Sequence, residues 1–171
     1  MSSGMPIYWP LEKVSANLWN STEQLYQASK YSTSVMCLPS PTSKGDPSVR
    51  NRIRAAKSPL GSKITQESAN DAGLMRDDWK SPSEVRLKSM TWVLELKVFW
   101  HPDTFGRTLK ETGNLPIVEI SSQDDFWGCL QKPGQRLVGE NYLGRLLMRV
   151  RNRIPEISEG RFTFPKGFLL P

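Results

Sequence analysis

The sequence predicts an α+β fold that is predominantly helical and forms one compact domain with a few short strands. The chain has 171 residues, of which 37% are hydrophobic and 23% charged, and this length is enough to bury a core within a single domain. One segment, 81–100, begins with a helix N-cap pattern and is rich in apolar residues, and another, 141–154, repeats its apolar residues with helical periodicity. The clearest strand-like runs, 7–10 and 115–120, are short.

The first helix is predicted to follow Ser21, a favourable N-cap, with Gln24 where a capping box has its second residue. It comes after an N-terminal extension, residues 1–16, whose short strand ends at Pro10. Beyond the helix, residues 38–47 are rich in proline and serine and therefore predict a surface loop.

Three more helices are predicted between residues 48 and 100. Residues 48–57 predict a short basic helix, which is either a solvated face or a source of phosphate contacts, and 60–74 predict another helix. The helix at 81–100 has Ser81 as its N-cap and Pro82 at its first position. Because apolar residues cover much of its circumference, it is the best candidate for a central buried helix.

The last part of the chain is predicted to contain a helix at 102–112, a strand at 115–120 and a site-bearing loop at 121–128. The helix at 141–154 has one apolar face. Its opposite face carries three arginines: Arg145, Arg149 and Arg153. The tail, residues 155–171, is expected to pack on the domain, as a cap on the core or as an edge strand.

Composition limits the classes of function. The net charge of +6 and the pI near 9.5 favour polyanionic partners, either nucleic acid or phosphate-rich small molecules. Cys37 and Cys129 lack metal-site spacing and predict free thiols in a reducing compartment, the cytoplasm, and no metal or cofactor is expected. We also expect no membrane helix and no signal peptide. His101 precedes a proline at a helix junction and predicts a cap rather than a catalyst.

A polar stripe on the first helix is the strongest functional feature. Glu23, Gln27 and Lys30 lie at i, i+4 and i+7 and therefore share one face. The carboxylate and the amine are too far apart for a salt bridge within the helix, at about 10 Å along its axis, but both can reach a ligand lying across it. A solvated polar face is the simpler interpretation. Aromatic residues flank the stripe and favour a pocket instead: Trp19, Tyr26 and Tyr31.

The candidate site residues combine two carboxylates, an amine, two indoles and an amide: Glu23, Lys30, Trp79, Asp124, Trp127 and Asn141. This set suits cleavage of a glycosidic C–N bond, because a carboxylate stabilises positive charge on the sugar and a carboxyl protonates the leaving base. Indole rings stack on a flat base. A lysine desolvated between aromatic rings becomes nucleophilic and can hold the opened sugar as a Schiff base. A structural role remains the alternative for each residue.

Residues 22–31, TEQLYQASKY, resemble the S/T-E-H-Y-Y-Q-A-x-K-F motif of the NADAR family, also called YbiA-like. Further segments resemble that family's motifs in the same order: Ser58-Pro59, RDDW at 76–79, Met90 with KVF at 97–99, LKETG at 109–113, IVE at 117–119, DDFWG at 124–128 and GENYLGRLLMRVR at 139–151. The resemblance implies a YbiA-like domain at 17–154. The chain departs from the pattern at Leu130, where the family often has glycine.

The resemblance implies an N-glycosidase. One branch of the family cleaves phosphorylated ribosylamine intermediates of riboflavin synthesis, and another removes ADP-ribose from guanine and acts as an antitoxin. Carried over by position, Lys30 is the covalent nucleophile, Glu23 orients the ribose or acts as acid and base, and Asp124 is the third catalytic residue. The implied ligand-binding residues are Trp19, Tyr26, Gln27, Trp79, Trp127, Gly128, Asn141 and Arg145. Asn141 is expected to bind phosphate or ribose beside free N–H groups at a helix start.

Three functions are open at this point. The favoured one is a glycosidase for ADP-ribosylated guanine in DNA or RNA, which releases ADP-ribose and counters a cognate ADP-ribosyltransferase toxin encoded nearby. The second is a glycosidase for riboflavin intermediates, which needs no affinity for DNA. The third is a reader of ADP-ribose that performs no chemistry.

Overall fold

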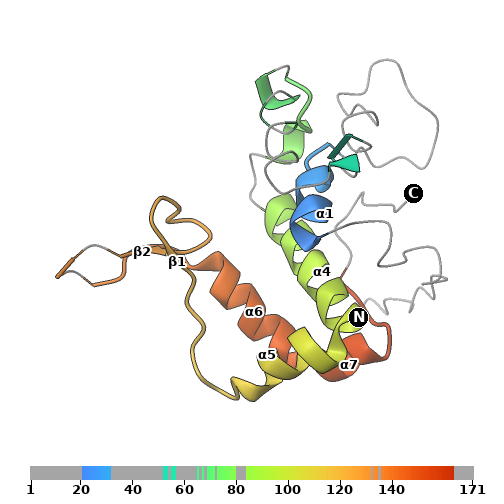
Figure 1. Cartoon of the computed structure of the whole chain (residues 1–171), viewed down its shortest axis with the longest axis vertical. Helices are drawn as coiled ribbons and strands as arrows, with labels where there is room; N and C mark the ends of the chain where they lie inside the picture. Colours follow the sequence, from blue (N-terminus) through green and yellow to red (C-terminus); the bar gives the residue numbers. More distant parts are fainter. Residues whose placement is uncertain are drawn as a thin grey trace, which may run out of the picture. The chain divides into compact units, whose positions relative to one another are not determined.

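A computed structural model describes residues 21–31, 52–53, 55–56, 65, 67, 69–71, 73–79, 84–131, 133–134 and 136–163. Over these residues the chain is predominantly helical with one short two-stranded sheet (Figure 1), which confirms the predicted fold class. The structure divides into two compact units, one formed by Met1–Val93 with Thr163–Pro171 and the other by Leu94–Phe162. The predicted domain limits at residues 17 and 154 stay predictions.

Several predicted features lie outside the described residues: the extension 1–16 with its strand, Trp19, Cys37, the loop at 38–47, the helix start at Ser81 and Pro82, and the tail beyond residue 163. The helices predicted at 48–57 and 60–74 are described only in part. Helical residues are present in both segments.

Helix α1 (Thr22–Ser29) begins where the sequence predicts, because the Ser21 Oγ accepts a hydrogen bond from the Gln24 N–H at 3.1 Å. The reciprocal bond of the predicted capping box, from the Ser21 N–H to the Gln24 side-chain oxygen, stays a prediction. The Gln24 side chain is buried, and its Nε2 donates to the carbonyl of Ala56 at 2.7 Å. Gln24 therefore ties α1 to a segment that lies 32 residues further along the chain.

The core of the first unit forms around the end of α1. Tyr31 is fully buried in a cluster with Ala28, Ile53 and Ala69. Its hydroxyl donates to Asn70 Oδ1 at 2.6 Å, which satisfies the polar end of this aromatic side chain. Burial raises the pKa of Tyr31 to about 12, because the phenolate would lose its hydration.

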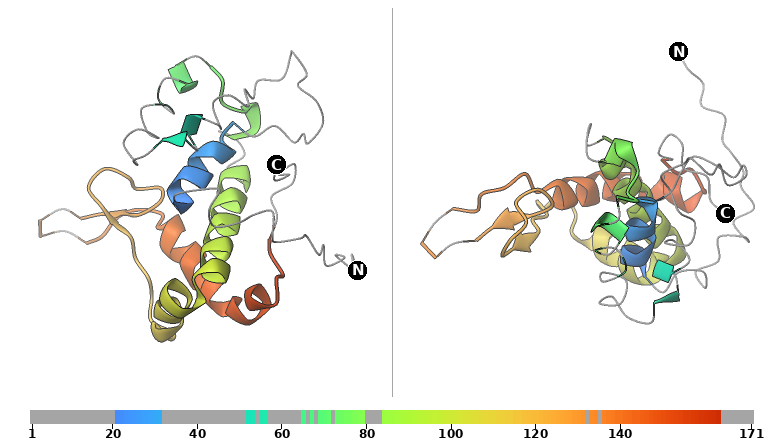
Figure 2. Two further views of the ribbon diagram at one scale, coloured as in Figure 1. Left: turned by 45° about the vertical axis from the view of Figure 1, so that its right-hand side comes forward. Right: turned by 90° about the horizontal axis from the view of Figure 1, so that it is seen from above.

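Among the described helices, α4 (Glu84–Trp100) is the longest. Its N-terminal half lies alongside α1 in two views of the structure (Figures 1 and 2). The predicted burial is confirmed for the second half of this helix, where five apolar residues are buried: Trp92, Val93, Leu94, Leu96 and Val98. Its central position stays a prediction. Two buried polar residues, Ser89 and Glu95, had not been predicted.

In the second unit, the π-helix η4 (Pro102–Gly106) passes directly into α5 (Arg107–Glu111). The chain then turns at Gly113, as predicted, with a left-handed φ of 55° that glycine adopts without strain. His101 occupies the N-cap position of η4, but its side chain makes no capping hydrogen bond, so its predicted capping was wrong.

Strands β1 (Ile120–Ser121) and β2 (Cys129–Leu130) are parallel, with Ile120 opposite Cys129. Leu130 also forms an antiparallel bridge with Val138. The strand predicted at 115–120 was too long, because the Asn141 side chain takes hydrogen bonds of Ile117 and Glu119 that a neighbouring strand would use. The two strands of this sheet therefore lie at the two ends of the predicted 121–128 loop.

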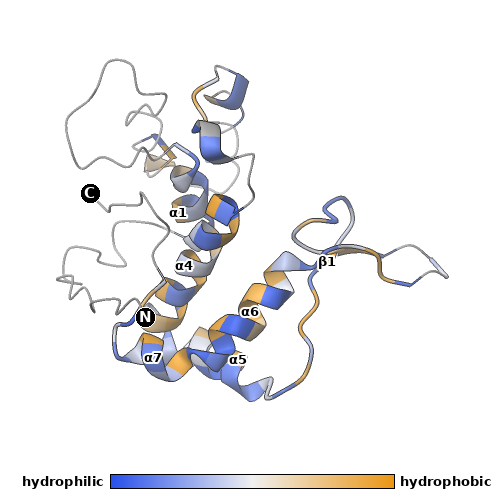
Figure 3. Cartoon of the chain, turned by 180° about the vertical axis from the view of Figure 1, so that it is seen from behind, coloured by the Kyte–Doolittle hydropathy of each residue, from blue (hydrophilic) through white to orange (hydrophobic). Residues whose placement is uncertain are grey.

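Helix α6 (Tyr142–Asn152) alternates apolar and polar residues along its length, as Figure 3 shows, and it buries Leu146 and Val150. Arg145 and Arg149 lie on the exposed face, as predicted. None of the described helices combines the length and apolar character of a membrane-spanning segment.

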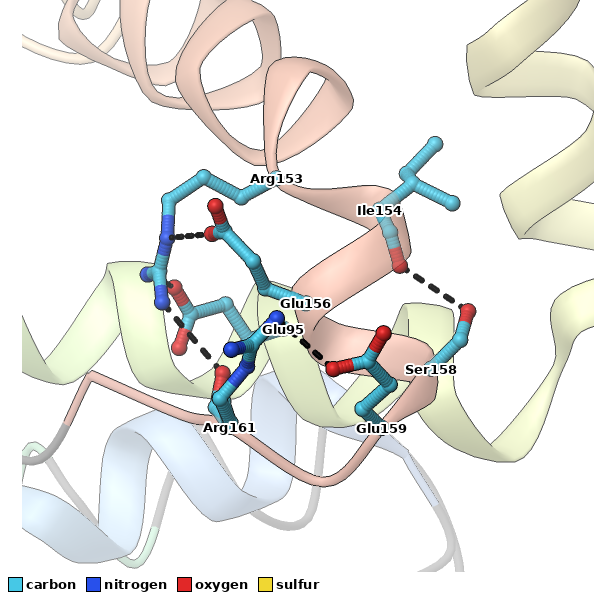
Figure 4. Close-up of polar contacts among 7 residues, drawn as sticks. All are labelled: Glu95, Arg153, Ile154, Glu156, Ser158, Glu159 and Arg161. Atoms are coloured by element: carbon cyan, nitrogen blue, oxygen red, sulfur yellow. Dashed lines mark hydrogen bonds and ion pairs between the residues drawn. The ribbon is translucent and has the colours of Figure 1, made fainter. Parts of the chain in front are cut away.

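Arg153 was wrongly predicted to lie on the solvated face. It stands between α6 and α7 (Ile154–Ser158), and its Nη1 pairs with the fully buried carboxylate of Glu95 (Figure 4). Its Nε bonds Glu156 Oε2 at 2.9 Å, and its Nη2 donates to the carbonyl of Arg161 at 3.3 Å. The arginine points inward because a buried carboxylate without a partner costs several kcal/mol.

Candidate active site

The polar stripe predicted on α1 is present. Gln27 Nε2 donates a hydrogen bond to Glu23 Oε1, so these two side chains lie together on one face of the helix. Glu23 itself is exposed. The other amide atom, Gln27 Oε1, is buried and has no hydrogen-bond partner in the described part of the chain. A buried acceptor of this kind is suited to receive a donor from a ligand.

Lys30 follows the last turn of α1 and is half-buried. Its N–H donates to the Gln27 carbonyl at 3.3 Å, and its own carbonyl accepts from the Arg76 N–H at 3.0 Å. The backbone of Lys30 is thus held from two sides. Its Nζ lies 5.7 Å from the centroid of the Tyr26 ring, within the range of a cation–π contact.

Burial lowers the pKa of the Lys30 amine from 10.5 to about 8. The Glu23 carboxylate raises this pKa, and the Arg86 guanidinium lowers it. Near neutral pH the neutral amine is therefore more common on Lys30 than on an ordinary lysine. A desolvated lysine of this kind is equipped to act as a nucleophile.

Two aromatic rings pack together on the Tyr26 side of the Lys30 amine. The rings of Tyr26 and Trp79 have centroids 5.5 Å apart and are tilted by 53°, and both residues are buried. Trp79 belongs to the 3-10 helix η3 (Asp77–Trp79) and packs as a core residue. A contact of Trp79 with a ligand stays a prediction.

Arg76 anchors η3 to the end of α1. Besides its backbone bond to Lys30, its guanidinium makes two bonds to the Asp78 carboxylate, the longer at 2.8 Å from Nη2. Sequence reasoning missed Arg86 on α4. The sequence feature that could have identified Arg86 is its positive charge near the start of a helix that is apolar over much of its circumference.

Asp124 folds the loop between β1 and β2. Its Oδ1 accepts hydrogen bonds from the N–H groups of Phe126 and Trp127 at 2.9 and 2.8 Å. Ser121 Oγ accepts from the Asp124 N–H at 2.9 Å in the same way. These local bonds give Asp124 a structural role, and its predicted part in catalysis stays a prediction.

An aromatic cluster covers this loop. The Phe126 ring lies 5.0 Å from the Trp127 ring, nearly perpendicular to it, and 4.6 Å from the Tyr142 ring. The Arg145 guanidinium stands 5.5 Å from the centroid of Tyr142 and 3.9 Å from the Glu140 carboxylate. Trp127 is half-buried and Arg145 is exposed, so both can be reached from outside the second unit's core.

Asn141 joins α6 to the segment before β1. It takes a left-handed conformation, with φ of 50°, and its amide accepts from the Glu119 N–H at 3.0 Å and donates to the Ile117 carbonyl at 2.9 Å. The prediction of free N–H groups at the start of α6 was wrong. Carbonyls of residues 125–128 accept the N–H groups of Glu140, Asn141, Tyr142 and Leu143.

Two glycines allow this loop to close. A Cβ at Gly139 would collide with the Gly128 carbonyl, and its φ of 156° is rare for other residues. A Cβ at Gly128 would lie 2.8 Å from the Glu119 carbonyl. Gly128 therefore permits close backbone packing, while its predicted contact with a ligand stays a prediction.

The structure brings each half of the predicted set together within its own unit. The first unit holds Glu23, Tyr26, Gln27, Lys30 and Trp79, and the second holds Asp124, Trp127, Gly128, Asn141 and Arg145. Convergence of the two halves on one ligand stays a prediction. Among the described residues, no cluster of histidine, cysteine, aspartate and glutamate has the arrangement of a metal site.

A helical protein that keeps a desolvated amine beside a carboxylate has the marks of a ligand-binding or catalytic protein, because such perturbed groups concentrate at functional sites. The chain belongs to the NADAR family. The family's model, described as NADAR domain, matches residues 7–155.

Similar curated proteins have two kinds of name. One is an N-glycosidase from Nostoc punctiforme, 31% identical over 80% of this chain and 74% of that protein. Another is the chloroplastic riboflavin biosynthesis protein PYRR from Arabidopsis thaliana, 34% identical over 59% of this chain. The match spans only 16% of the Arabidopsis protein, and 20% of the PYRR protein from Zea mays. No solved structure gives a significant match.

Proposed function

We propose that this chain is an N-glycosidase, which hydrolyses the bond between a base nitrogen and the anomeric carbon of a ribose. The half-buried Lys30 amine carries the proposal, because its pKa of about 8 gives a reactive fraction near neutral pH. The N-glycosidase name of the Nostoc punctiforme relative supports it.

The proposed reaction proceeds through a covalent sugar intermediate. The neutral Lys30 amine attacks the anomeric carbon, and the C–N bond to the base breaks, with its electron pair leaving on the base. A carboxyl, for which Glu23 is our candidate, gives the base a proton. The sugar ring opens to a Schiff base on Lys30, and water then adds to release the sugar and restore the amine. The net change is hydrolysis of one C–N bond.

Our preferred substrate is guanine carrying ADP-ribose in DNA or RNA, with ADP-ribose as the product. The net charge of +6 supports a polyanionic substrate. We further propose that Trp79 stacks on the base. Under this proposal the chain counters an ADP-ribosyltransferase toxin in the cytoplasm, where the Cys129 thiol stays reduced.

The second candidate substrate is a phosphorylated ribosylaminouracil of riboflavin synthesis. The names of the relatives from Arabidopsis thaliana, Zea mays and Vibrio vulnificus favour it. The same Lys30 chemistry would serve this substrate, since its bond also joins ribose to a nitrogen.

The direct test is to incubate the protein with each substrate and to trap the intermediate with borohydride, which reduces a Schiff base to a stable amine. We expect an ADP-ribosylated guanine oligonucleotide to release ADP-ribose, and the trapped sugar to be found on the peptide that contains Lys30. Lys30→Ala should abolish both signals, whereas Lys88→Ala, which removes an exposed lysine of α4, should preserve them.

Other results point to the alternatives. Turnover of ribosylaminouracil phosphate alone would select the riboflavin substrate. Binding of ADP-ribose without release of any base, and with equal affinity in Lys30→Ala, would contradict a glycosidase and select the non-catalytic reader.

A further inference from the structure

The side-chain amide of Gln27 has one atom that is hydrogen-bonded and one that is not. Its Nε2 donates to Glu23 Oε1, and because a carboxylate only accepts hydrogen bonds, this contact fixes which end of the amide faces Glu23. The opposite atom, Oε1, is buried and has no partner among the residues that the structure describes. A glutamine on a solvated helix face would keep this oxygen in water. An acceptor that is buried without a donor instead costs folding free energy.

Gln27 lies between the two reactive groups of the proposed site. Lys30, the C-cap residue of α1, keeps helical dihedrals, with φ of −64° and ψ of −24°, so the helical spacing continues to it. That spacing places Gln27 about 6 Å along the axis from Glu23 and about 4.5 Å from Lys30. A substrate that spans Glu23 and Lys30 must therefore pass Gln27.

The chemistry of the proposed reaction indicates which substrate group can satisfy this acceptor. The Lys30 amine attacks the anomeric carbon, and the next carbon of a ribose, C2, carries a hydroxyl. This hydroxyl is a donor beside the reacting atom, and hydrogen bonds to it strengthen in the transition state of glycoside hydrolysis. A side-chain carbonyl, which can only accept, suits it. Both candidate substrates provide this group, because both are ribosides.

We propose that Gln27 is a specificity-determining residue: its Oε1 accepts a hydrogen bond from the C2 hydroxyl of the sugar and so selects ribosides over 2-deoxyribosides. This inference rests on the proposed glycosidase function. Glu23 takes part by holding the amide so that the oxygen is left for the substrate. The sugars of a DNA strand lack this hydroxyl, whereas the ribose of an attached ADP-ribose group carries it. Gln27 thus confines cleavage to the added group.

The first measurement compares kcat/KM on a riboside with kcat/KM on the matching 2-deoxyriboside, both carrying the base that the wild type releases. Gln27→Met removes the acceptor and should lower kcat/KM at least about 30-fold on the riboside but less than about twofold on the 2-deoxyriboside. A 2-deoxyriboside is intrinsically easier to hydrolyse. The change of the ratio between variant and wild type cancels that difference.

Gln27→Glu separates the acceptor from the contact with Glu23. It retains a side-chain oxygen but cannot donate to the Glu23 carboxylate, so activity should fall on both substrates while the preference for the riboside persists. Gln131→Met, at an exposed glutamine of the second unit, is the matched control and should keep the wild-type rate and ratio. Circular dichroism of each variant confirms that it is folded. Equal losses on both substrates in Gln27→Met would overturn the inference and leave Gln27 only the positioning of Glu23.

The second measurement needs no turnover. Calorimetric titration with ribose 5-phosphate and 2-deoxyribose 5-phosphate is made in Lys30→Met, which forms no Schiff base and therefore reports the non-covalent contact. Ribose 5-phosphate should bind at least about tenfold more tightly, and the added change Gln27→Met should make the two affinities equal.

The outcomes separate the two proposals. A preference that Gln27→Met leaves intact, or one that follows the C3 hydroxyl in a 3-deoxy analogue, would overturn the role of Gln27, and so would failure of both sugar phosphates to bind. Absence of base release by the wild type contradicts the proposed glycosidase, and the binding ratio then decides the role of Gln27 by itself.

Discussion

At the scale of single residues, Lys30 lies where its charged form is destabilised. The Lys30 backbone bonds Gln27 of α1 and Arg76, and its half-buried side chain places Nζ 5.7 Å from the centroid of the Tyr26 ring. Its ammonium form is therefore less stable in the folded protein than in the unfolded chain. A lysine kept only for solubility would point outward and would avoid this penalty.

Lys30→Met should abolish activity and stabilise the protein at the same time. At pH 7 we expect the free energy of unfolding to rise by about 1–2 kcal/mol, because the substitution removes a partly desolvated charge. Urea denaturation followed by circular dichroism measures this change. A variant that is both inactive and less stable would contradict a strained catalytic lysine.

The same lysine should make stability depend on pH. Its pKa is about 8 in the folded state against 10.5 as the ordinary value, so the unfolded chain binds more protons between these two pH values. The free energy of unfolding contributed by Lys30 must therefore rise with pH from about 8 to 10.5. Denaturation midpoints at pH 7.5, 9 and 10 should show this slope in the wild type and lose it in Lys30→Met.

At the scale of elements, the loop between β1 and β2 is shaped by polar side chains and glycines rather than by apolar packing. Asp124 and Asn141 both bond backbone groups, and the first N–H groups of α6 are used by the loop carbonyls. The loop and the start of α6 are therefore joined by hydrogen bonds. A ligand here would meet side chains rather than unbonded N–H groups of that helix start.

Asp124→Asn separates the structural and the catalytic role of this residue. The asparagine keeps the side-chain oxygen that accepts from Phe126 and Trp127 but cannot ionise. We expect the melting temperature to change by less than about 2 °C while kcat falls at least about 100-fold. Asp125→Asn, at an exposed neighbouring carboxylate, is the control and should be fully active. Full activity in Asp124→Asn would leave the aspartate a purely structural role.

Gly139→Ala should destabilise the second unit by about 2–3 kcal/mol, because the new methyl group meets the Gly128 carbonyl at a strained φ of 156°. Gly134→Ala is the matched control. Its φ is also positive, at 70°, but nothing lies within 4 Å of the added carbon, so a cost of only about 1 kcal/mol is expected. Urea midpoints of both variants measure the difference, and equal losses would rule out the collision.

At the scale of the whole molecule, the second unit depends on a buried ion pair. Arg153 pairs with the fully buried Glu95 and also bonds Glu156 and the Arg161 carbonyl (Figure 4). One side chain therefore fixes the ends of α6 and α7 to α4. An ion pair of this kind adds little net stability but is costly to break on one side.

Arg153→Met should lower the free energy of unfolding by about 2–3 kcal/mol, since it leaves the Glu95 carboxylate buried without this arginine. Replacing both residues, as Glu95→Leu with Arg153→Met, should recover most of that loss. Arg149→Met, at an exposed arginine one turn earlier on α6, should change stability by less than about 0.5 kcal/mol. Thermal and urea unfolding of the three variants measure these values, and an equal loss in Arg149→Met would contradict the importance of the buried pair.

Local pattern was sufficient for much of this protein. The start of α1 at Ser21, the shared face of Glu23 and Gln27, and the buried character of α4 follow from spacing and side-chain type, which act over one or two helical turns. The ordered motifs along the chain likewise identified the NADAR family, which the match over residues 7–155 shows.

Tertiary structure alone decided the rest, because each of those features joins residues that are far apart in the sequence. The Gln24 amide donates to the Ala56 carbonyl, and the Asn141 amide donates to the carbonyl of Ile117, in the segment before β1. Arg153 points inward because it pairs with the buried Glu95, which lies 58 residues before it in the sequence. The lowered pKa of Lys30 has the same origin, because the sequence predicted the amine on a polar stripe and only tertiary packing partly desolvates it.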